Sequence, residues 1–133
     1  LRIVTDTAQI RKNLEYYIGK VPVKKTPAMS KSVYSVLYAR LGKAEQALHY
    51  FYDSYLPNLN PPFRVIAEFN GGTNPYFITG AGGTLQAIIF GFAGLEITDK
   101  GLKQVYTPIL PKEWSSLTIR VAGKEIVHVN KNE

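Results

Sequence analysis

The residue pattern changes character at about residue 95, and this change limits the architectures open to the chain. Before it, apolar residues recur at the spacing of helices; the predicted helices are 7–19, 31–41, 43–56 and 83–94. After it, apolar and β-branched residues alternate with polar ones; the predicted strands are 95–98, 102–110, 117–123 and 124–130, with a turn at Ala122-Gly123. Helices followed by a small antiparallel β unit predict an α+β fold.

Local signals mark the ends of the predicted helices. Asp6 is a suitable N-cap and Gly19 a suitable end for the first helix, while Ser30 is expected to cap the second. Gly42 separates the second and third helices, which we expect to form an antiparallel hairpin, and Pro57 is expected to end the third. This hairpin is similar to one tetratricopeptide repeat, but such arrays need several copies about 34 residues apart, and the sequence contains no second copy.

Composition narrows the function classes. The net charge is +6, but the basic residues are scattered and no nucleic-acid-binding motif is present, so no nucleic-acid partner is predicted. No apolar run reaches the roughly 18 residues of a membrane span, so no membrane partner is predicted either. Cysteine is absent, and His49 and His128 lie far apart in the sequence. The spacing of His49 and Asp53 predicts that they share a helix face, but no third ligand is evident, so we predict no metal site and no cofactor. These features do not decide between cytoplasm and periplasm.

The glycine-rich stretch at residues 80–83 allows several interpretations. It lacks the Gly-Lys-Ser/Thr of a Walker loop and the G-x-G-x-x-G spacing of a dinucleotide site. Its glycines can allow a tight turn and close packing before a buried helix over 83–94. Alternatively, the first amides of that helix can bind a polar ligand.

Glu68 is the only acid in a mostly apolar stretch and precedes the loop "NGGTNP". One interpretation is an exposed carboxylate on the polar side of an extended segment over 63–69. The other is a general acid or base at the edge of a cleft, where the glycines of the loop admit a substrate. The residue pattern alone leaves both open.

Four stretches in order carry a likeness to a known family: "IRKNLEYY", "TPAMSKSVYSVLYARLG", "PPFRVIAE" and "NPYFITGAGGTLQAIIFGFAGLEIT". Over residues 1 to about 120 the chain resembles the C-terminal part of glycoside hydrolase family 65, whose members act on α-glucosides. The resemblance implies the last helices of an (α/α)6 barrel in residues 1–94 and a small β-domain in residues 95–133. It also implies that the general acid lies upstream, in the rest of a longer chain, so we expect the isolated piece to be inactive.

The resemblance also bears on the reaction. The phosphate pocket of the family's phosphorylases uses a His and a Ser, whereas residues 76–81 here contain neither, and no Lys, Arg or His lies between Phe69 and Lys100. Hydrolase members are expected to use the Glu of the "PF…E" segment, here Glu68, to activate water. The substrate-binding residues then expected are Gly71, Gly72, Thr73, Tyr76, Phe77 and Thr79. The leading prediction is an inverting hydrolase whose partner is an α-glucoside disaccharide or oligosaccharide; a phosphorylase or a non-catalytic helical interaction module are the alternatives.

Overall fold

The computed structural model describes residues 6–22, 26–74, 76–121 and 123–130, and within them the predicted α+β class is confirmed. The helices are α1 (Thr7–Ile18), α2 (Ala28–Arg40), α3 (Ala44–Asp53), the 3-10 turn η2 (Leu56–Asn58), and α4 (Ile78–Gln86), which continues as the π-helix η3 (Ala87–Phe92). The strands form three antiparallel pairs: β1 (Leu59–Asn60) with β2 (Val65–Ile66), β3 (Leu95–Thr98) with β4 (Gly101–Gln104), and β5 (Ser116–Val121) with β6 (Lys124–Val129).

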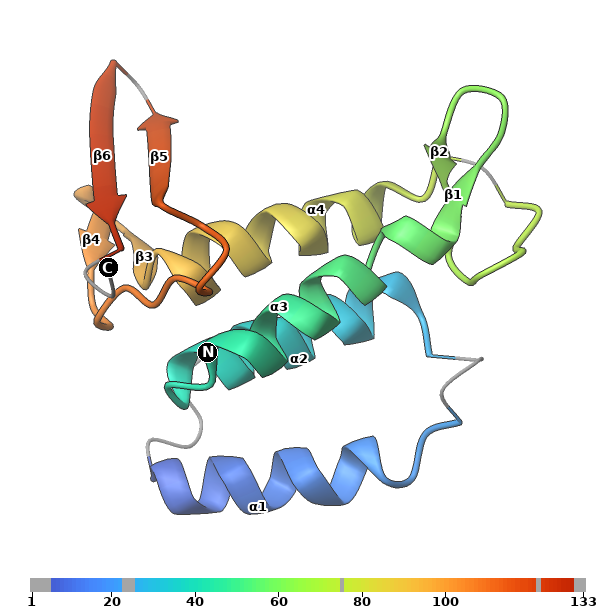
Figure 1. Cartoon of the computed structure of the whole chain (residues 1–133), viewed down its shortest axis with the longest axis horizontal. Helices are drawn as coiled ribbons and strands as arrows, with labels where there is room; N and C mark the ends of the chain where they lie inside the picture. The colour runs from blue at the N-terminus through green and yellow to red at the C-terminus, as the bar shows by residue number, and fades with distance from the viewer. Residues whose placement is uncertain (1–5, 23–25, 75, 122, 131–133) are drawn as a thin grey trace.

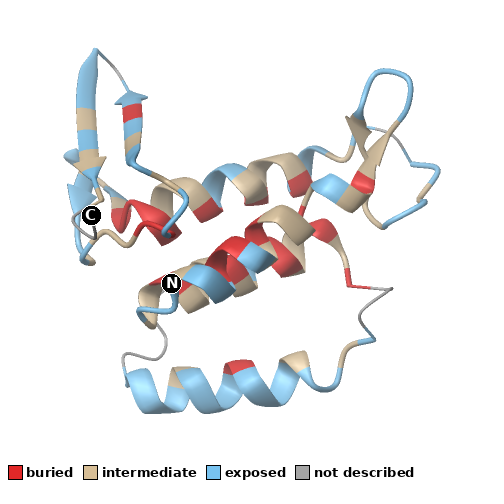
Figure 2. Cartoon of the chain, viewed as in Figure 1, coloured by how far each residue is buried: buried red, intermediate tan, exposed pale blue. Residues whose placement is uncertain are grey.

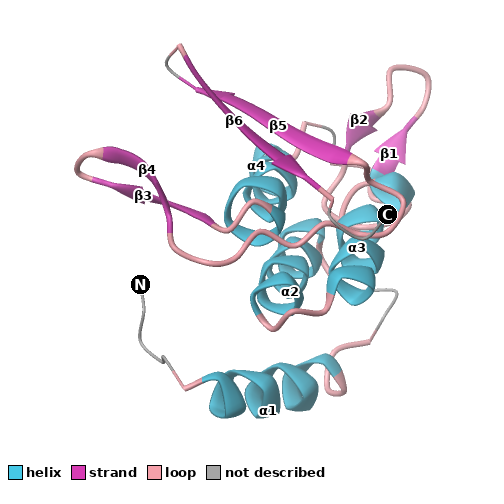
Figure 3. Cartoon of the chain, turned by 60° about the vertical axis from the view of Figure 1, so that its left-hand side comes forward, coloured by secondary structure: helices cyan, strands magenta, loops and turns pink. Residues whose placement is uncertain are grey.

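Helix α2 lies at the centre of the arrangement (Figure 1). Helix α3 runs beside it, α4 covers another side, and α1 lies on the side of α2 opposite α4, where it contacts α2 (Figures 1 and 3). The β1–β2 hairpin lies at the start of α4, whereas strands β3 to β6 gather at the far end of η3 (Figure 1). None of the described helices is long and apolar enough to cross a membrane.

Small side chains explain why α2 can pack so closely against two neighbours. Its buried positions are mostly small, and Ser35 donates a hydrogen bond to the Ala47 carbonyl of α3 at 2.8 Å. On the other side, a Cβ added at Gly83 of α4 would lie 3.0 Å from the Ser32 Cβ of α2. The buried residues therefore gather where α2, α3 and α4 face one another (Figure 2).

The first helix follows its predicted end signals. Asp6 accepts a hydrogen bond from the amide of Ala8 at 2.9 Å, and Gly19 is the C-cap. On the predicted apolar stripe, only Leu14 is buried, and Tyr17 is 60% exposed. Most of the surface of α1 is therefore open to solvent in this chain.

Two predicted helix ends are wrong. Ser30 does not cap α2; the N-cap is Pro27, and the amide of Ala28 donates to the main-chain carbonyl of Glu68 at 2.9 Å. A contact with a distant segment thus satisfies the helix end, and no side-chain cap is needed. Helix α3 ends at Asp53 rather than at Leu56, and Pro57 lies inside the 3-10 turn that follows.

The glycine-rich stretch is also placed differently from the prediction. The helix begins at Ile78, so Gly80, Gly82 and Gly83 lie within α4 instead of forming a turn before it. The prediction that the glycines allow close packing is confirmed for Gly80 and Gly83 by their short approaches to α2. The helix is not buried on all sides, because Ile78 and Leu85 are exposed in this chain.

The β region contains two separate hairpins, and the strand predicted over 102–110 ends at Gln104. The chain turns back there because the amides of Val105 and Tyr106 both donate to the Gly94 carbonyl at 3.0 Å. In the second hairpin, Ile119 is opposite Ile126, as the alternation predicts. The turn predicted at Ala122-Gly123 lies partly outside the described residues.

An aromatic cluster joins the helices to the β region. The ring of Trp114 lies 4.7 Å from that of Phe92 and 5.7 Å from that of Phe51, measured between centroids. Leu117 of β5 packs against the same core. The last helical residues and the segment before β5 therefore share buried apolar surface.

Candidate functional site

Glu68 lies directly after β2, at the end of the β1–β2 hairpin, and is half-buried. Its main-chain carbonyl accepts the hydrogen bond from Ala28 at the start of α2. The preceding residue, Ala67, is completely buried, and its amide donates to the Asn58 carbonyl at 2.8 Å. These contacts fix the backbone of Glu68 between the N-terminus of α2 and the hairpin, while its carboxylate stays accessible.

The loop after Glu68 is held by polar contacts at its base. The amide of Gly72 donates to the Phe69 carbonyl at 2.9 Å, and the Asn60 Nδ2 donates to the Gly72 carbonyl at 2.7 Å. Gly71 has a φ of 73°, a conformation that glycine adopts at little cost. Gly71 and Thr73 are exposed, so the tip of the loop faces solvent while its base is tied to β1.

Asn74 is a polar residue of this loop that the sequence interpretation did not single out. Its Nδ2 donates to Glu68 Oε2 at 3.3 Å, and its Oδ1 accepts from the amide of Glu68 at 3.4 Å. The available signal was an Asn in a glycine-rich loop, since Asn side chains often bind nearby backbone groups in turns. That signal does not say which group the amide will bind.

Three other predicted site residues, Tyr76, Phe77 and Thr79, lie at the start of α4. The amide of Phe77 donates to the Ile66 carbonyl at 2.9 Å, so the start of α4 is joined to the strand that leads to Glu68. Tyr76 and Thr79 are exposed, and Tyr76 has a φ of 61°. The structure thus brings Gly72 and Phe77 into the framework around Glu68. Within the described residues, no hydrogen bond links Thr73, Tyr76 or Thr79 to the Glu68 carboxylate.

An ion pair joins helix α2 to helix α3. Lys31 is 6% exposed, and its Nζ lies 3.0 Å from Asp53 Oδ2. His49 and Asp53, predicted to share a face of α3, line the same small cavity of about 120 Å³ as Lys31. In the part of the chain that the structure describes, no three His, Cys, Asp or Glu side chains lie close enough together to hold a metal ion.

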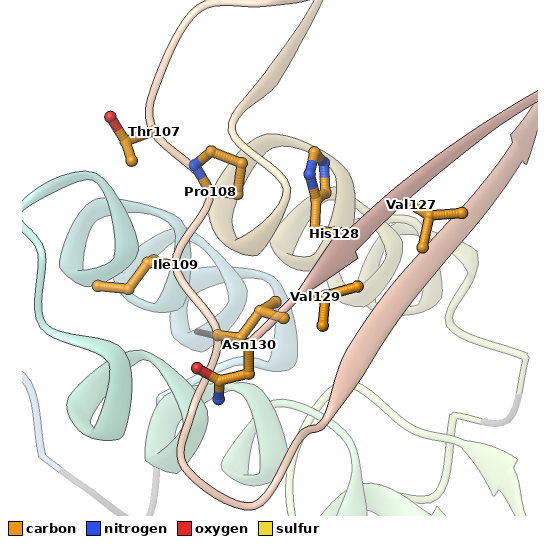
Figure 4. Close-up of a pocket in the computed structure, with 8 residues that line it drawn as sticks. Thr107, Pro108, Ile109, Val127, His128, Val129 and Asn130 are labelled. Atoms are coloured by element: carbon orange, nitrogen blue, oxygen red, sulfur yellow. The ribbon is translucent and has the colours of Figure 1, made fainter. Parts of the chain in front are cut away.

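A separate cavity of about 440 Å³ lies between β6 and the segment 107–110 (Figure 4). It belongs to the β region, at the opposite end of the α4–η3 helix from Glu68 (Figure 1). His128 lines it, and its Nε2 is buried without a hydrogen-bond partner among the described residues. Burial lowers the pKa of His128 below its usual value, because the charged imidazolium loses hydration there.

The sequence has extensive similarity to known proteins. It is 53% identical over 125 residues to a kojibiose hydrolase of Mucilaginibacter mallensis and 56% identical over 126 residues to a kojibiose hydrolase of Flavobacterium johnsoniae. It is 31% identical over 124 residues to an α,α-trehalose phosphorylase of Geobacillus stearothermophilus. These alignments cover 94%, 94% and 91% of this chain, respectively.

The chain therefore belongs to the glycoside hydrolase family 65-like proteins, a class that includes both hydrolases and phosphorylases of glucosides. Within this class, the two kojibiose hydrolases are much more similar to it than the phosphorylase is. The chain spans 18% of the length of either kojibiose hydrolase. No protein-family model matches the chain.

Proposed function

We propose that the chain is part of an inverting α-glucoside hydrolase in which Glu68 acts as the general base. In this reaction Glu68 takes a proton from water, and the water oxygen forms a bond to the anomeric carbon. The glycosidic bond breaks as a general acid, located in the remainder of the longer protein, protonates the leaving oxygen. Inverting enzymes place the two carboxyl groups roughly 6.5–9.5 Å apart, which leaves room for the water.

The observation that carries this proposal is the placement of Glu68. A general base needs a carboxylate that reaches solvent or substrate from a rigid support. The backbone of Glu68 is fixed by the contacts with Ala28 and with the neighbouring hairpin, and its side chain remains half-exposed beside a glycine loop. The high identity to two kojibiose hydrolases supports hydrolysis, and it makes kojibiose the first substrate to test.

The architecture of the whole protein is part of the same proposal. Residues 1–94 would contribute the last helices of an (α/α)6 barrel, and residues 95–133 a C-terminal β-domain. The exposed apolar side chains of Ile78 and Leu85 on α4 are consistent with a helix that packs against further chain. Gly71, Gly72, Thr73, Tyr76, Phe77 and Thr79 are proposed to shape the sugar-binding surface.

The experiment replaces Glu68 by Gln in the longer protein that contains this chain. Because general-base catalysis contributes about 10²–10⁴-fold, we expect kcat for kojibiose hydrolysis to fall by that factor. Glu125→Gln is the matched control, since Glu125 lies in an exposed ion pair with Arg120, and it should leave kcat unchanged. A loss smaller than tenfold for Glu68→Gln would exclude Glu68 as the base.

Products separate hydrolysis from phosphorolysis. A hydrolase releases free glucose at the same rate with and without inorganic phosphate, whereas a phosphorylase forms a glucose 1-phosphate only when phosphate is present. We expect phosphate-independent release of glucose. The 133-residue chain alone should have no activity, because it lacks the proposed acid; turnover of any α-glucoside by the chain alone would contradict the proposed division of roles.

A further inference from the structure

The side chain of Asn74 contacts Glu68 at two points. Its Nδ2 donates to the carboxylate oxygen Oε2 at 3.3 Å, and its Oδ1 accepts from the main-chain amide of the same residue at 3.4 Å. A carboxamide has a donor at one end and an acceptor at the other, so one Asn can bind both groups together. An Asp, a Ser or an Ala at position 74 cannot make the same pair of contacts.

Gly72 leaves the space that this arrangement needs. A Cβ at Gly72 would lie 3.1 Å from the Asn74 Oδ1 and 3.0 Å from the Phe69 carbonyl oxygen. A Cβ at this position would therefore require the Phe69 carbonyl or the Asn74 side chain to shift by a few tenths of an ångström. The Gly72 carbonyl is in turn held by the Asn60 side chain at 2.7 Å. The position of Asn74 thus depends on a loop that is itself fixed to β1.

The backbone of Glu68 is fixed, but its side chain can still rotate. Its carbonyl is bound to Ala28, and the preceding amide of Ala67 is bound to Asn58. These backbone contacts do not fix the side-chain torsions of Glu68. The hydrogen bond from Asn74 to Oε2 restricts those torsions.

We propose that Asn74 is the positioning residue of the general base: it holds Oε2 of Glu68 so that Oε1 is presented to the attacking water. This inference rests on the proposed function, because it assigns Asn74 a role through Glu68. The proton passes from water to Oε1, and Asn74 neither gains nor loses a proton. Asn74 therefore acts on the orientation of Glu68 and not on the substrate itself.

The test compares Asn74→Ala and Asn74→Asp in the longer protein, with kojibiose as substrate. Since a displacement of about 1 Å can cost a hundredfold in rate, we expect Asn74→Ala to lower kcat by about 10- to 100-fold, with little change in KM. Asn74→Asp retains the acceptor for the main-chain amide of Glu68 but lacks the donor to Oε2, so its kcat should fall by a similar factor, again with little change in KM.

Asn70→Ala is the matched control, since Asn70 is an exposed Asn of the same loop. It should leave both kcat and KM unchanged. If Asn74→Asp retained the kcat of the unsubstituted protein while Asn74→Ala lost it, only the backbone contact would matter, Asn74 would have a structural role and the inference would be overturned. If Asn74→Ala proved too unstable to assay, the near-isosteric Asn74→Asp would decide by the same comparison of kcat with KM.

The failure of this inference can be told apart from the failure of the proposed function. If Glu68→Gln abolishes turnover while Asn74→Ala and Asn74→Asp behave like the unsubstituted protein, Glu68 remains the base and the role of Asn74 is refuted. If Glu68→Gln itself retains activity, the proposed function fails, and the inference about Asn74 fails with it. A loss of activity in Glu68→Gln together with a lowered kcat in both Asn74 variants supports both.

Discussion

Gly80 of α4 and Ala28 of α2 lie so close together that a Cβ on Gly80 would be 2.9 Å from the Ala28 Cβ. The same added atom would lie 2.8 Å from the Phe77 ring. Gly82, only two residues further along the helix, has no atom within 4 Å of its added Cβ. One helix thus contains a glycine required by packing and a glycine with open space.

This difference predicts opposite stability effects for two alanine substitutions. Gly82→Ala should raise the free energy of unfolding by about 0.5–1 kcal/mol, because alanine loses less backbone entropy in a helix. Gly80→Ala has the same entropic gain but forces α2 and α4 apart, and a net loss of about 1–2 kcal/mol is expected. Denaturant unfolding followed by circular dichroism measures both. Equal effects of the two substitutions would contradict the packing argument.

The pair formed by Lys31 and Asp53 should be sensitive to the loss of one partner. Asp53→Asn leaves a buried ammonium group without its carboxylate, and we expect the free energy of unfolding to fall by about 1–3 kcal/mol. The double variant Lys31→Met/Asp53→Asn should recover most of that loss, because no buried charge remains. The exposed pair of Arg120 and Glu125 provides the comparison, and Glu125→Gln should change stability by less than about 0.5 kcal/mol.

Trp114 is the only tryptophan in the sequence, and it contacts rings from α3 and η3. Trp114→Ala should therefore lower the free energy of unfolding by about 2–4 kcal/mol, since the side chain is partly buried. Tyr16→Ala, at an exposed position on α1, should have little effect. In the unsubstituted chain, Trp114 fluorescence and helical circular dichroism should change at the same denaturant concentration. Two separate transitions would show that the β region unfolds independently.

His128 predicts a dependence of stability on pH. Burial lowers the pKa of His128 in the folded state, so the unfolded state binds more protons as the pH falls below the usual value near 6.5. Stability should be constant above that value and decrease as the pH falls through the interval between the unfolded and folded pKa values. The measurement is the melting temperature at pH 7.5 and pH 5.5. His128→Gln should reduce the difference between them, and an unchanged difference would refute the assignment.

Features set by neighbouring residues could be predicted from the sequence. The Asp6 cap, the hairpin around Gly42 and the end of the long helix just before Gly94 depend on residues within a turn or two of each end. The pairing of β5 with β6 follows similarly, because Ile119 and Ile126 alternate with polar neighbours on either side of a short turn. Each of these signals lies within the segment whose structure it predicts.

Features set by distant contacts could not be predicted in the same way. Ser30 was a reasonable cap, but the first amide of α2 finds its acceptor at Glu68, forty residues later in sequence order. The predicted helix begins at Gly83, whereas α4 begins at Ile78 and contains Gly80, and only the proximity of α2 explains glycine at positions 80 and 83. The pairing of Asn74 with Glu68 was missed because an Asn in a loop has many possible partners. The catalytic role of Glu68 itself stays a prediction until it is measured.

The segment that carries Glu68 is attached by a series of backbone hydrogen bonds. Ile66, Ala67, Glu68 and Phe69 each bind another residue by a main-chain carbonyl or amide. Most side chains are compatible with such bonds, so a mutation here can replace the functional group without dismantling its support. The backbone hydrogen bonds of this segment can therefore be kept while a side chain in it changes. Relatives with the same backbone framework can thus carry different side chains at position 68.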